Sequence, residues 1–110
     1  MRVIHLPLFV VTDNPNDKQV QVGNMLRWAV VRDESLTKGL DRLILGKRLI
    51  EKIEGFEKSA VLELEEQEHK ELCRIIDNHQ WGGVGFFLVD VLTKIRDTKE
   101  GDEKPKEKKK

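Results

Sequence analysis

The chain has 110 residues, of which 38% are hydrophobic and 36% are charged, so we expect one domain with a modest core. Its 20 Lys and Arg balance its 20 Asp and Glu, which excludes a global electric field that would draw the protein to nucleic acid or an anionic membrane. No apolar run approaches the ~18 residues that span a bilayer, so we expect no membrane partner. The single cysteine excludes an internal disulfide and a four-cysteine zinc site.

The amino-terminal segment predicts two short strands. Residues 2–11 are rich in Val, Ile, Leu and Phe, but Pro7 lacks an N–H group, so it confines such a strand to a sheet edge or breaks it into two pieces. The sequence "TDNPND" at 12–17 is typical of a turn, and "KQVQV" at 18–22 alternates as a returning strand does, which together predict a hairpin. Because Pro7 interrupts the apolar run and no small-residue cleavage site follows, we expect no signal peptide and a cytoplasmic location.

The next segment predicts a helix over about 23–32. Met25, Trp28 and Ala29 share one face at helical spacing. The β-branched pair Val30–Val31 keeps open the alternative that "LRWAVV" at 26–31 forms a strand.

The strongest helical pattern covers about residues 37–53, with Ser35 or Thr37 as the cap and Gly55 as the residue that stops it. Its apolar arc is wide, because it contains two rows at helical spacing. Such a helix contacts neighbours on two sides, or a partner chain on one. One row consists of Leu36, Leu40, Leu43 and Ile50. The other row, for which we predict an interface between proteins, consists of Leu45, Leu49 and Ile53.

The second half of the chain predicts a short strand and two helices. "SAVLEL" at 59–64 suits a strand, and the acids that follow it favour the positive end of a helix over about 65–78. A helix over about 84–97 follows from apolar residues at spacings of four, three and four: Val84, Leu88, Val91 and Ile95. From residue 98 the chain has no apolar residue and carries six lysines against four acids. We therefore expect a folded domain at 1–97 and a disordered tail at 98–110.

Two groups of residues suggest chemistry. "GGVG" at 82–85 precedes a helix, as phosphate-binding loops do, but the lysine and hydroxyl residue of a P-loop are missing, so a turn between helices is favoured. His69 and Cys73 lie one helical turn apart with His79 further on, whereas zinc needs three or four converging ligands and a Cys–His nucleophile needs an orienting group. We favour Cys73 as a buried, apolar-like residue with His69 at the rim. We predict no catalytic residue, no cofactor and no metal site.

Charged and aromatic side chains supply the other candidate contacts. Arg42, Lys47 and Arg48, with the tail lysines, predict a weak contact with nucleic acid, although pairing with the acids at 63–71 is the favoured interpretation. Trp28 and Trp81 each lie beside a helix boundary, where an exposed aromatic residue can anchor an interface. Phe86 would join Trp81 in such a contact.

The order of the segments resembles that of a group of short bacteriophage-encoded proteins. The resemblance covers about residues 18–96 and rests on the spacing of apolar residues in "VQVGNMLRWAVV", "GLDRLILGKRLIEKI", "VLELEEQEHKELCRIIDN" and "GGVGFFLVDVL". Here "GNM" stands where those proteins have a capping threonine or serine. The resemblance implies the cytoplasm of an infected host as the setting and another phage or host protein as a partner, and it implies no chemistry.

Together these patterns predict an α+β fold in which amino-terminal short strands or a hairpin precede three to four packed helices and a disordered charged tail. The predicted function is that of a non-enzymatic protein-interaction module, which associates with itself as a homodimer or higher oligomer through an apolar helix face. The alternative is a nucleic-acid-binding accessory protein that uses the basic helix face and the lysine-rich tail.

Overall fold

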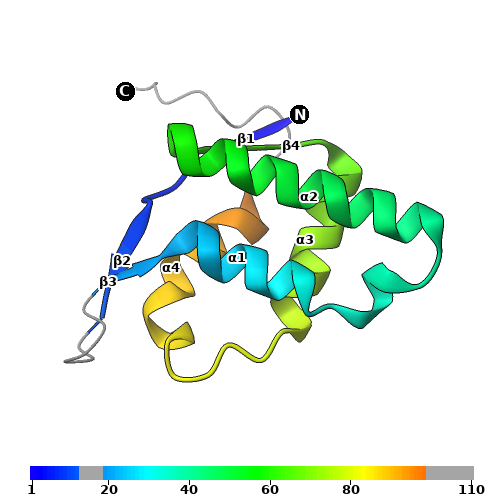
Figure 1. Ribbon diagram of the computed structural model, residues 1–110. Coiled ribbons are helices and arrows are strands. Elements are labelled where there is room, and N and C mark those ends of the chain that lie inside the picture. Colours follow the sequence, from blue (N-terminus) through cyan, green and yellow to red (C-terminus); the bar gives the residue numbers. More distant parts are fainter. Residues whose placement is uncertain (13–18, 99–110) are drawn as a thin grey trace.

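The computed structural model describes residues 1–12 and 19–98 (Figure 1). The chain order is β1 (Arg2–His5), β2 (Phe9–Val11), β3 (Gln19–Gln21), α1 (Val22–Val31), the 3-10 turn η1 (Glu34–Thr37), α2 (Leu40–Ser59), β4 (Val61–Leu64), α3 (Glu66–Asn78) and α4 (Gly85–Asp97). The predicted α+β fold is confirmed. The turn predicted at 12–17 and the tail predicted from 98 lie outside the described residues, except for Thr12 and Thr98. Thr98 is buried and its carbonyl accepts a hydrogen bond from Arg2, so it belongs to the folded domain.

Pro7 divides the amino-terminal apolar segment into two strands with different partners. β1 pairs antiparallel with β4, so that Arg2 lies opposite Leu64. β2 pairs antiparallel with β3, so that Phe9 lies opposite Gln21. The predicted hairpin is therefore β2–β3, whereas β1 belongs to a second sheet whose other strand follows α2. This division follows from the missing N–H of proline, which interrupts the ladder between the two pieces.

α1 is helical, so the alternative that residues 26–31 form a strand is wrong. Its inner side buries Val22, Leu26, Ala29 and Val30. This spacing follows the helical period, and the burial of these side chains outweighs the strand preference of two adjacent valines. No side chain caps the first turn; the residue at the capping position is Gln21, and "GNM" lies inside the helix.

α2 starts later than the sequence predicts. Neither Ser35 nor Thr37 caps it, and Gly39 precedes its first residue without a side-chain cap. The cap in this region belongs to η1, where the Asp33 carboxylate accepts a hydrogen bond from the N–H group of Leu36 at 3.2 Å.

α2 also ends later than predicted. It passes through Gly55 and ends at Ser59, followed by Ala60 as a left-handed cap with a φ of 62°, so the predicted stop at Gly55 is wrong. Phe56 provides the physical reason, because it is fully buried and extends the inner apolar row by one turn. Burying such a side chain contributes roughly 2–3 kcal/mol, whereas a glycine inside a helix costs about 1 kcal/mol.

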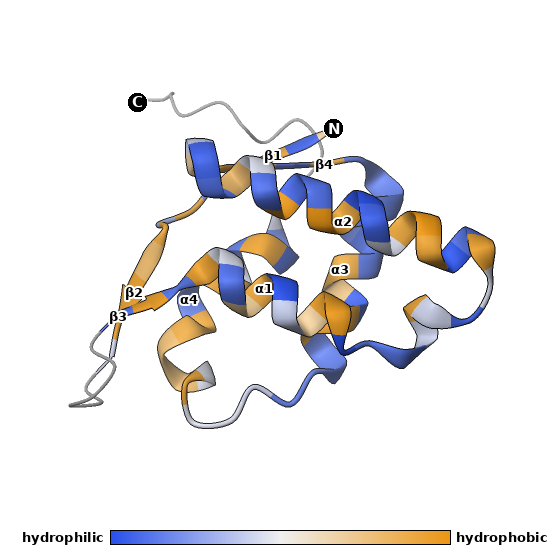
Figure 2. Ribbon diagram, viewed as in Figure 1, coloured by the Kyte–Doolittle hydropathy of each residue, from blue (hydrophilic) through white to orange (hydrophobic). Residues whose placement is uncertain are grey.

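The core fills the space among the helices and the β1–β4 sheet. Figure 2 shows apolar residues on the inner sides of the helices and also on the first turns of α2, at the outer end of that helix. α3 begins with a capping box in which Glu68 accepts the N–H group of Glu65 at 2.8 Å, so acids do start this helix as predicted. The largest fully buried side chains are Ile4, Val22, Leu26, Leu49, Ile53, Phe56, Leu62, Leu64, Leu72, Ile75, Leu88 and Ile95.

Candidate functional site

The predicted interface row on α2 is buried inside the domain. Leu45, Leu49 and Ile53 are only 5%, 0% and 0% exposed, on the side where α2 contacts α1, β4 and α3. The prediction that these residues meet another protein is therefore wrong. Their spacing correctly identifies a contact face, but spacing carries no information on whether the contact lies within the chain or outside it.

The exposed apolar side of α2 is formed by its first turns. Leu40, Leu43 and Ile44 are 71%, 50% and 42% exposed, and their separations of three and four positions place them on one side of the helix. Val31, at the end of α1, is 59% exposed. We call Leu40, Leu43, Ile44 and Val31 the docking face. Leu40 and Leu43 belong to the apolar row of this helix for which the sequence predicted no interface.

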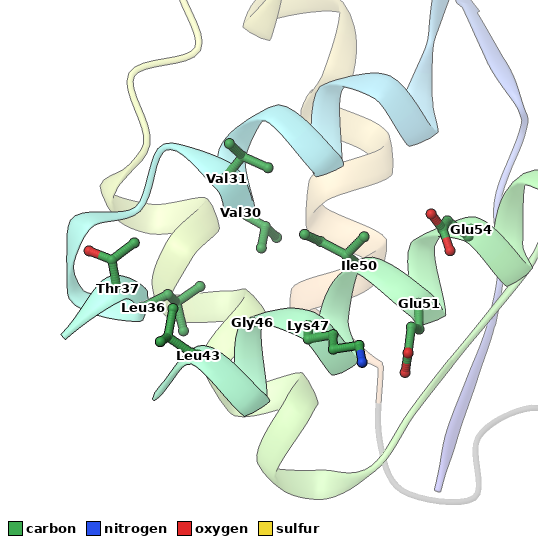
Figure 3. Close-up of a pocket in the computed structure, with 10 residues that line it drawn as sticks. All are labelled: Val30, Val31, Leu36, Thr37, Leu43, Gly46, Lys47, Ile50, Glu51 and Glu54. Atoms are coloured by element: carbon green, nitrogen blue, oxygen red, sulfur yellow. The ribbon is translucent and has the colours of Figure 1, made fainter. Parts of the chain in front are cut away.

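An apolar groove of about 410 Å³ joins the two parts of the docking face (Figure 3). Val30 and Val31 of α1, Leu36 of η1, and Leu43 and Ile50 of α2 supply its apolar lining. Charged side chains of α2 follow its edge, namely Lys47, Glu51 and Glu54. Single exposed apolar residues are ordinary on protein surfaces, but apolar residues that continue into a groove are typical of a contact site.

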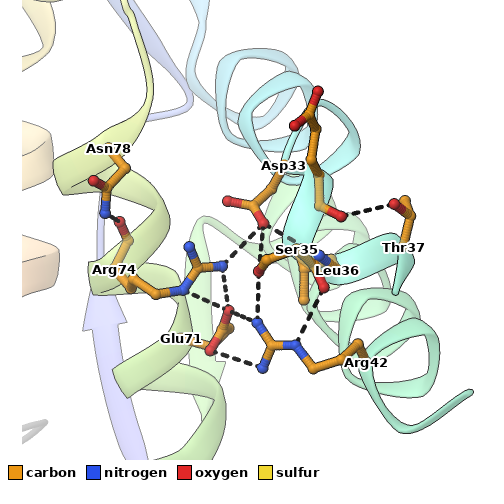
Figure 4. A network of polar contacts seen from close by, with 9 residues as sticks. Asp33, Ser35, Leu36, Thr37, Arg42, Glu71, Arg74 and Asn78 are labelled. Carbon is orange, nitrogen blue, oxygen red and sulfur yellow. Dashed lines mark hydrogen bonds and ion pairs between the residues drawn. The ribbon is translucent and has the colours of Figure 1, made fainter. Parts of the chain in front are cut away.

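An ionic network fixes the elements that form the groove (Figure 4). The guanidinium of Arg74 on α3 donates to Asp33 at 3.0 Å and to Glu71 at 2.8 Å. The guanidinium of Arg42 on α2 donates to the other side of the same cluster, reaching Glu71 and, at 2.9 Å, the hydroxyl of Ser35. η1 and α2, which are consecutive in the chain, are therefore joined to the more distant α3 by charge-assisted bonds, which are stronger than neutral ones.

The network keeps its two carboxylates ionised. Burial raises the pKa of Asp33, but hydrogen bonds from Arg74 and Ser35 outweigh this effect and hold the pKa below its ordinary value. Burial likewise raises the pKa of Glu71, and the bonds from Arg42 and Arg74 lower it further than burial raises it. Both carboxylates thus stay charged at neutral pH and keep their arginine partners in place.

The predicted basic contact does not form a continuous basic patch. The guanidinium of Arg42 is bound within the network. Lys47 and Arg48 are exposed, but they share the outer side of α2 with Asp41 and Glu51. The favoured interpretation, in which the basic helix pairs with the acids at 63–71, is confirmed only in part: Arg42 pairs with Glu71, and Lys52 pairs with Glu68. Lys47 and Arg48 form no ion pair among residues 1–12 and 19–98.

Trp28 is exposed and lies close to the docking face along α1. Its indole is 53% exposed, and the guanidinium of Arg32 lies 4.3 Å from the ring centroid as a cation–π contact. Trp28 precedes Val31 by three positions, so the two side chains are neighbours on the outer side of α1. The exposed apolar surface therefore continues from the groove toward Trp28.

Trp81 is part of the corner that joins α3 to α4. It is half-buried against the core, its indole N–H donates to the carbonyl of Ile76 at 3.1 Å, and its ring meets that of His79 edge to face with 4.5 Å between centroids. Gly82 turns the chain with a φ of 72°. The corner is thus a turn between helices, as predicted for "GGVG", and Trp81 has a structural contact.

Phe86 is far more exposed than Trp81, and it lies far from the docking face. Its side chain is 81% exposed on the first turn of α4, whereas Trp81 packs on the core. Figure 1 shows that the start of α4 lies at the opposite side of the molecule from the start of α2. The predicted aromatic residues therefore do not converge on one site.

The prediction that Cys73 is buried and His69 lies at the rim is wrong, because His69 is the more buried of the two. His69 is buried, and its Nε2 lies 2.7 Å from the carbonyl oxygen of Ile95, so this nitrogen donates its proton to the backbone. Cys73 is half-buried, with its Sγ 3.5 Å from Nε2 of His69. Burial, followed by the charge of Asp77, raises the pKa of the Cys73 thiol. The bond from His69 to the carbonyl of Ile95 joins α3 to α4.

Residues 1–12 and 19–98 contain no group of three or more His, Cys, Asp or Glu side chains placed to hold a metal ion. Over the same ranges, no helix combines the length and apolar composition that crossing a membrane requires. Comparisons with protein-family models, with curated proteins and with solved structures give no match, so they assign neither a family nor a function.

Proposed function

We propose that this protein is a non-enzymatic protein-interaction module that associates with itself through the docking face. One observation carries the proposal: α2 already has a complete buried row, yet its opposite side holds Leu40, Leu43 and Ile44 in solvent beside an apolar groove. Removing apolar surface from water contributes about 25 cal/mol per Å². Covering this side of α2 together with the groove would therefore stabilise a complex.

The rigidity of the surface supports the same function. Asp33 caps η1 and Arg42 belongs to α2, two of the elements that line the groove, and both are bound to side chains of α3. The walls that η1 and α2 supply are therefore held in place before a partner arrives. A preformed surface loses less conformational entropy on binding than a mobile one, so more of its apolar burial is available as affinity.

Nucleic-acid binding is the alternative function. It has less support, because Arg42 is already paired and Lys47 and Arg48 are interspersed with acids. The resemblance to bacteriophage proteins favours the cytoplasm of an infected host as the location. A second phage or host protein is then the other candidate partner for the docking face.

Sedimentation equilibrium of the full chain tests the proposal with two matched variants. Ile44→Glu places a charge on the docking face, and Val89→Glu makes the same change at a residue of α4 that is 53% exposed. We expect the wild-type chain to be a dimer, Ile44→Glu to be a folded monomer and Val89→Glu to remain a dimer. A wild-type monomer at every concentration, or a dimer that Ile44→Glu leaves intact, would refute self-association through this face.

A further inference from the structure

One row of exposed side chains on α2, which shares Ile44 with the docking face, has charges of opposite sign at its two ends. Asp41, Ile44 and Arg48 follow one another at separations of three and four positions, so they form a single stripe along the exposed side of the helix. The stripe begins with an acid, continues with an apolar side chain and ends with a base.

The two charges at the ends of this stripe have no ion-pair partner within the described residues. The ion pairs formed by residues 1–12 and 19–98 include neither Asp41 nor Arg48. The two groups cannot neutralise each other, because seven residues of helix separate them by ~10 Å along the axis. Both side chains are exposed on the free domain and are available to a partner.

We infer that the docking face binds a second copy of the chain with the two α2 helices antiparallel, so that Asp41 of each copy pairs with Arg48 of the other. A two-fold axis close to Ile44 brings the two Ile44 side chains together and creates both ion pairs at once. A parallel arrangement would set Asp41 opposite Asp41 and Arg48 opposite Arg48. The order of charges along the stripe therefore fits a second copy in one orientation only. This inference rests on the proposed function.

The apolar and charged parts of the stripe have different roles in this complex. Leu40 and Ile44 lose the most solvent contact at the axis and supply the affinity. Exposed ion pairs contribute little affinity each, but like charges placed opposite one another disfavour the wrong orientation. The methylene groups of Lys47 can also cover Leu40 of the second copy while its ammonium group stays in water.

A charge-reversal cycle on the full chain tests the orientation by sedimentation equilibrium. Asp41→Arg places two arginines together at both ends of the interface, and Arg48→Asp places two aspartates together. The double variant restores both ion pairs with their signs exchanged. We expect each single reversal to raise the dimer dissociation constant roughly tenfold or more, and the double variant to return within about threefold of the wild-type value. Lys70→Glu, an exposed charge reversal on α3, is the matched control and should change nothing.

The outcomes separate this inference from the proposed function. If Ile44→Glu abolishes the dimer but the single reversals behave like Lys70→Glu, or the double variant does not recover, the antiparallel arrangement is refuted and self-association stands. A monomeric wild-type chain refutes both, and leaves a different protein as the occupant of the docking face. Circular dichroism on each variant shows whether the monomer is folded, because Asp41 also lies in the first turn of α2, where an acid favours the helix.

Discussion

Replacing Glu71 by alanine tests how strongly the ionic network stabilises the domain. The Glu71 side chain is only 12% exposed and it accepts bonds from Arg42 and Arg74, whose side chains are 34% and 36% exposed. Removing one member of a buried ion pair costs about 3–5 kcal/mol, because the remaining charge is left without a partner. Here the arginines are one third exposed and keep Ser35 and Asp33 as partners, so water and these groups recover part of the loss. We expect the free energy of unfolding to fall by about 2–3 kcal/mol.

Urea denaturation followed by tryptophan fluorescence and circular dichroism measures this change. The expected result is a lower midpoint with an unchanged dependence on urea, as for a variant that changes stability without changing the folded surface. Asp97→Ala is the matched control, because the bond from Arg96 to Asp97 lies on the surface and its loss should not be measurable. If Glu71→Ala is no less stable than Asp97→Ala, the network does not stabilise the domain and the argument for a rigid groove is wrong.

Three further predictions concern the pH dependence of stability, two glycines within helices and the binding of DNA. Folding lowers the pKa of Asp33 and of Glu71, so the folded state binds fewer protons than the unfolded chain. The stability that these two carboxylates give to the fold is therefore complete above about pH 5 and is lost as the pH falls through their folded pKa values. Thermal midpoints measured at pH 6 and pH 3 should differ less in Glu71→Gln than in the wild type. Gly55→Ala should raise the free energy of unfolding, measured by urea denaturation, by about 0.5–1 kcal/mol, because the new Cβ meets open space. Gly23→Ala should give no such gain, because its Cβ would lie 2.5 Å from Cγ of Glu57. We expect no measurable binding to single-stranded DNA at low salt in fluorescence anisotropy, and binding that weakens steeply with salt and is lost in Arg48→Gln would favour the nucleic-acid alternative.

The sequence predicted the elements better than it predicted their contacts. Helical spacing correctly indicates α1 to α4, because each helix buries one stripe and the stripe repeats with the helical period. The same spacing could not place the end of α2. Glycine is a weak local signal, and the deciding contact was the burial of Phe56 by segments that are distant in sequence.

The candidate site shows the same limit more sharply. α2 has two apolar rows, and the sequence favoured the wrong one for a partner because only the positions of α1, β4 and α3 decide which row is covered. His69 was expected at the rim, yet a carbonyl at the end of α4 provides the partner that allows its burial. A periodic pattern shows that a surface will be covered, but the neighbour that covers it belongs to the tertiary structure.

The pairing of β1 with β4 has a consequence for how the chain folds. The contact between Arg2 and Leu64 closes a loop that contains β2, β3, α1 and α2, and closure of a long loop carries an entropic cost that local helix formation does not. α2 and β4 are adjacent in sequence and can associate early, which leaves β4 with an open edge until β1 arrives. On a ribosome, β1 would be synthesised before β4 but could pair only after β4 emerges, and the lifetime of that open edge would set the interval in which the nascent chain is exposed to aggregation.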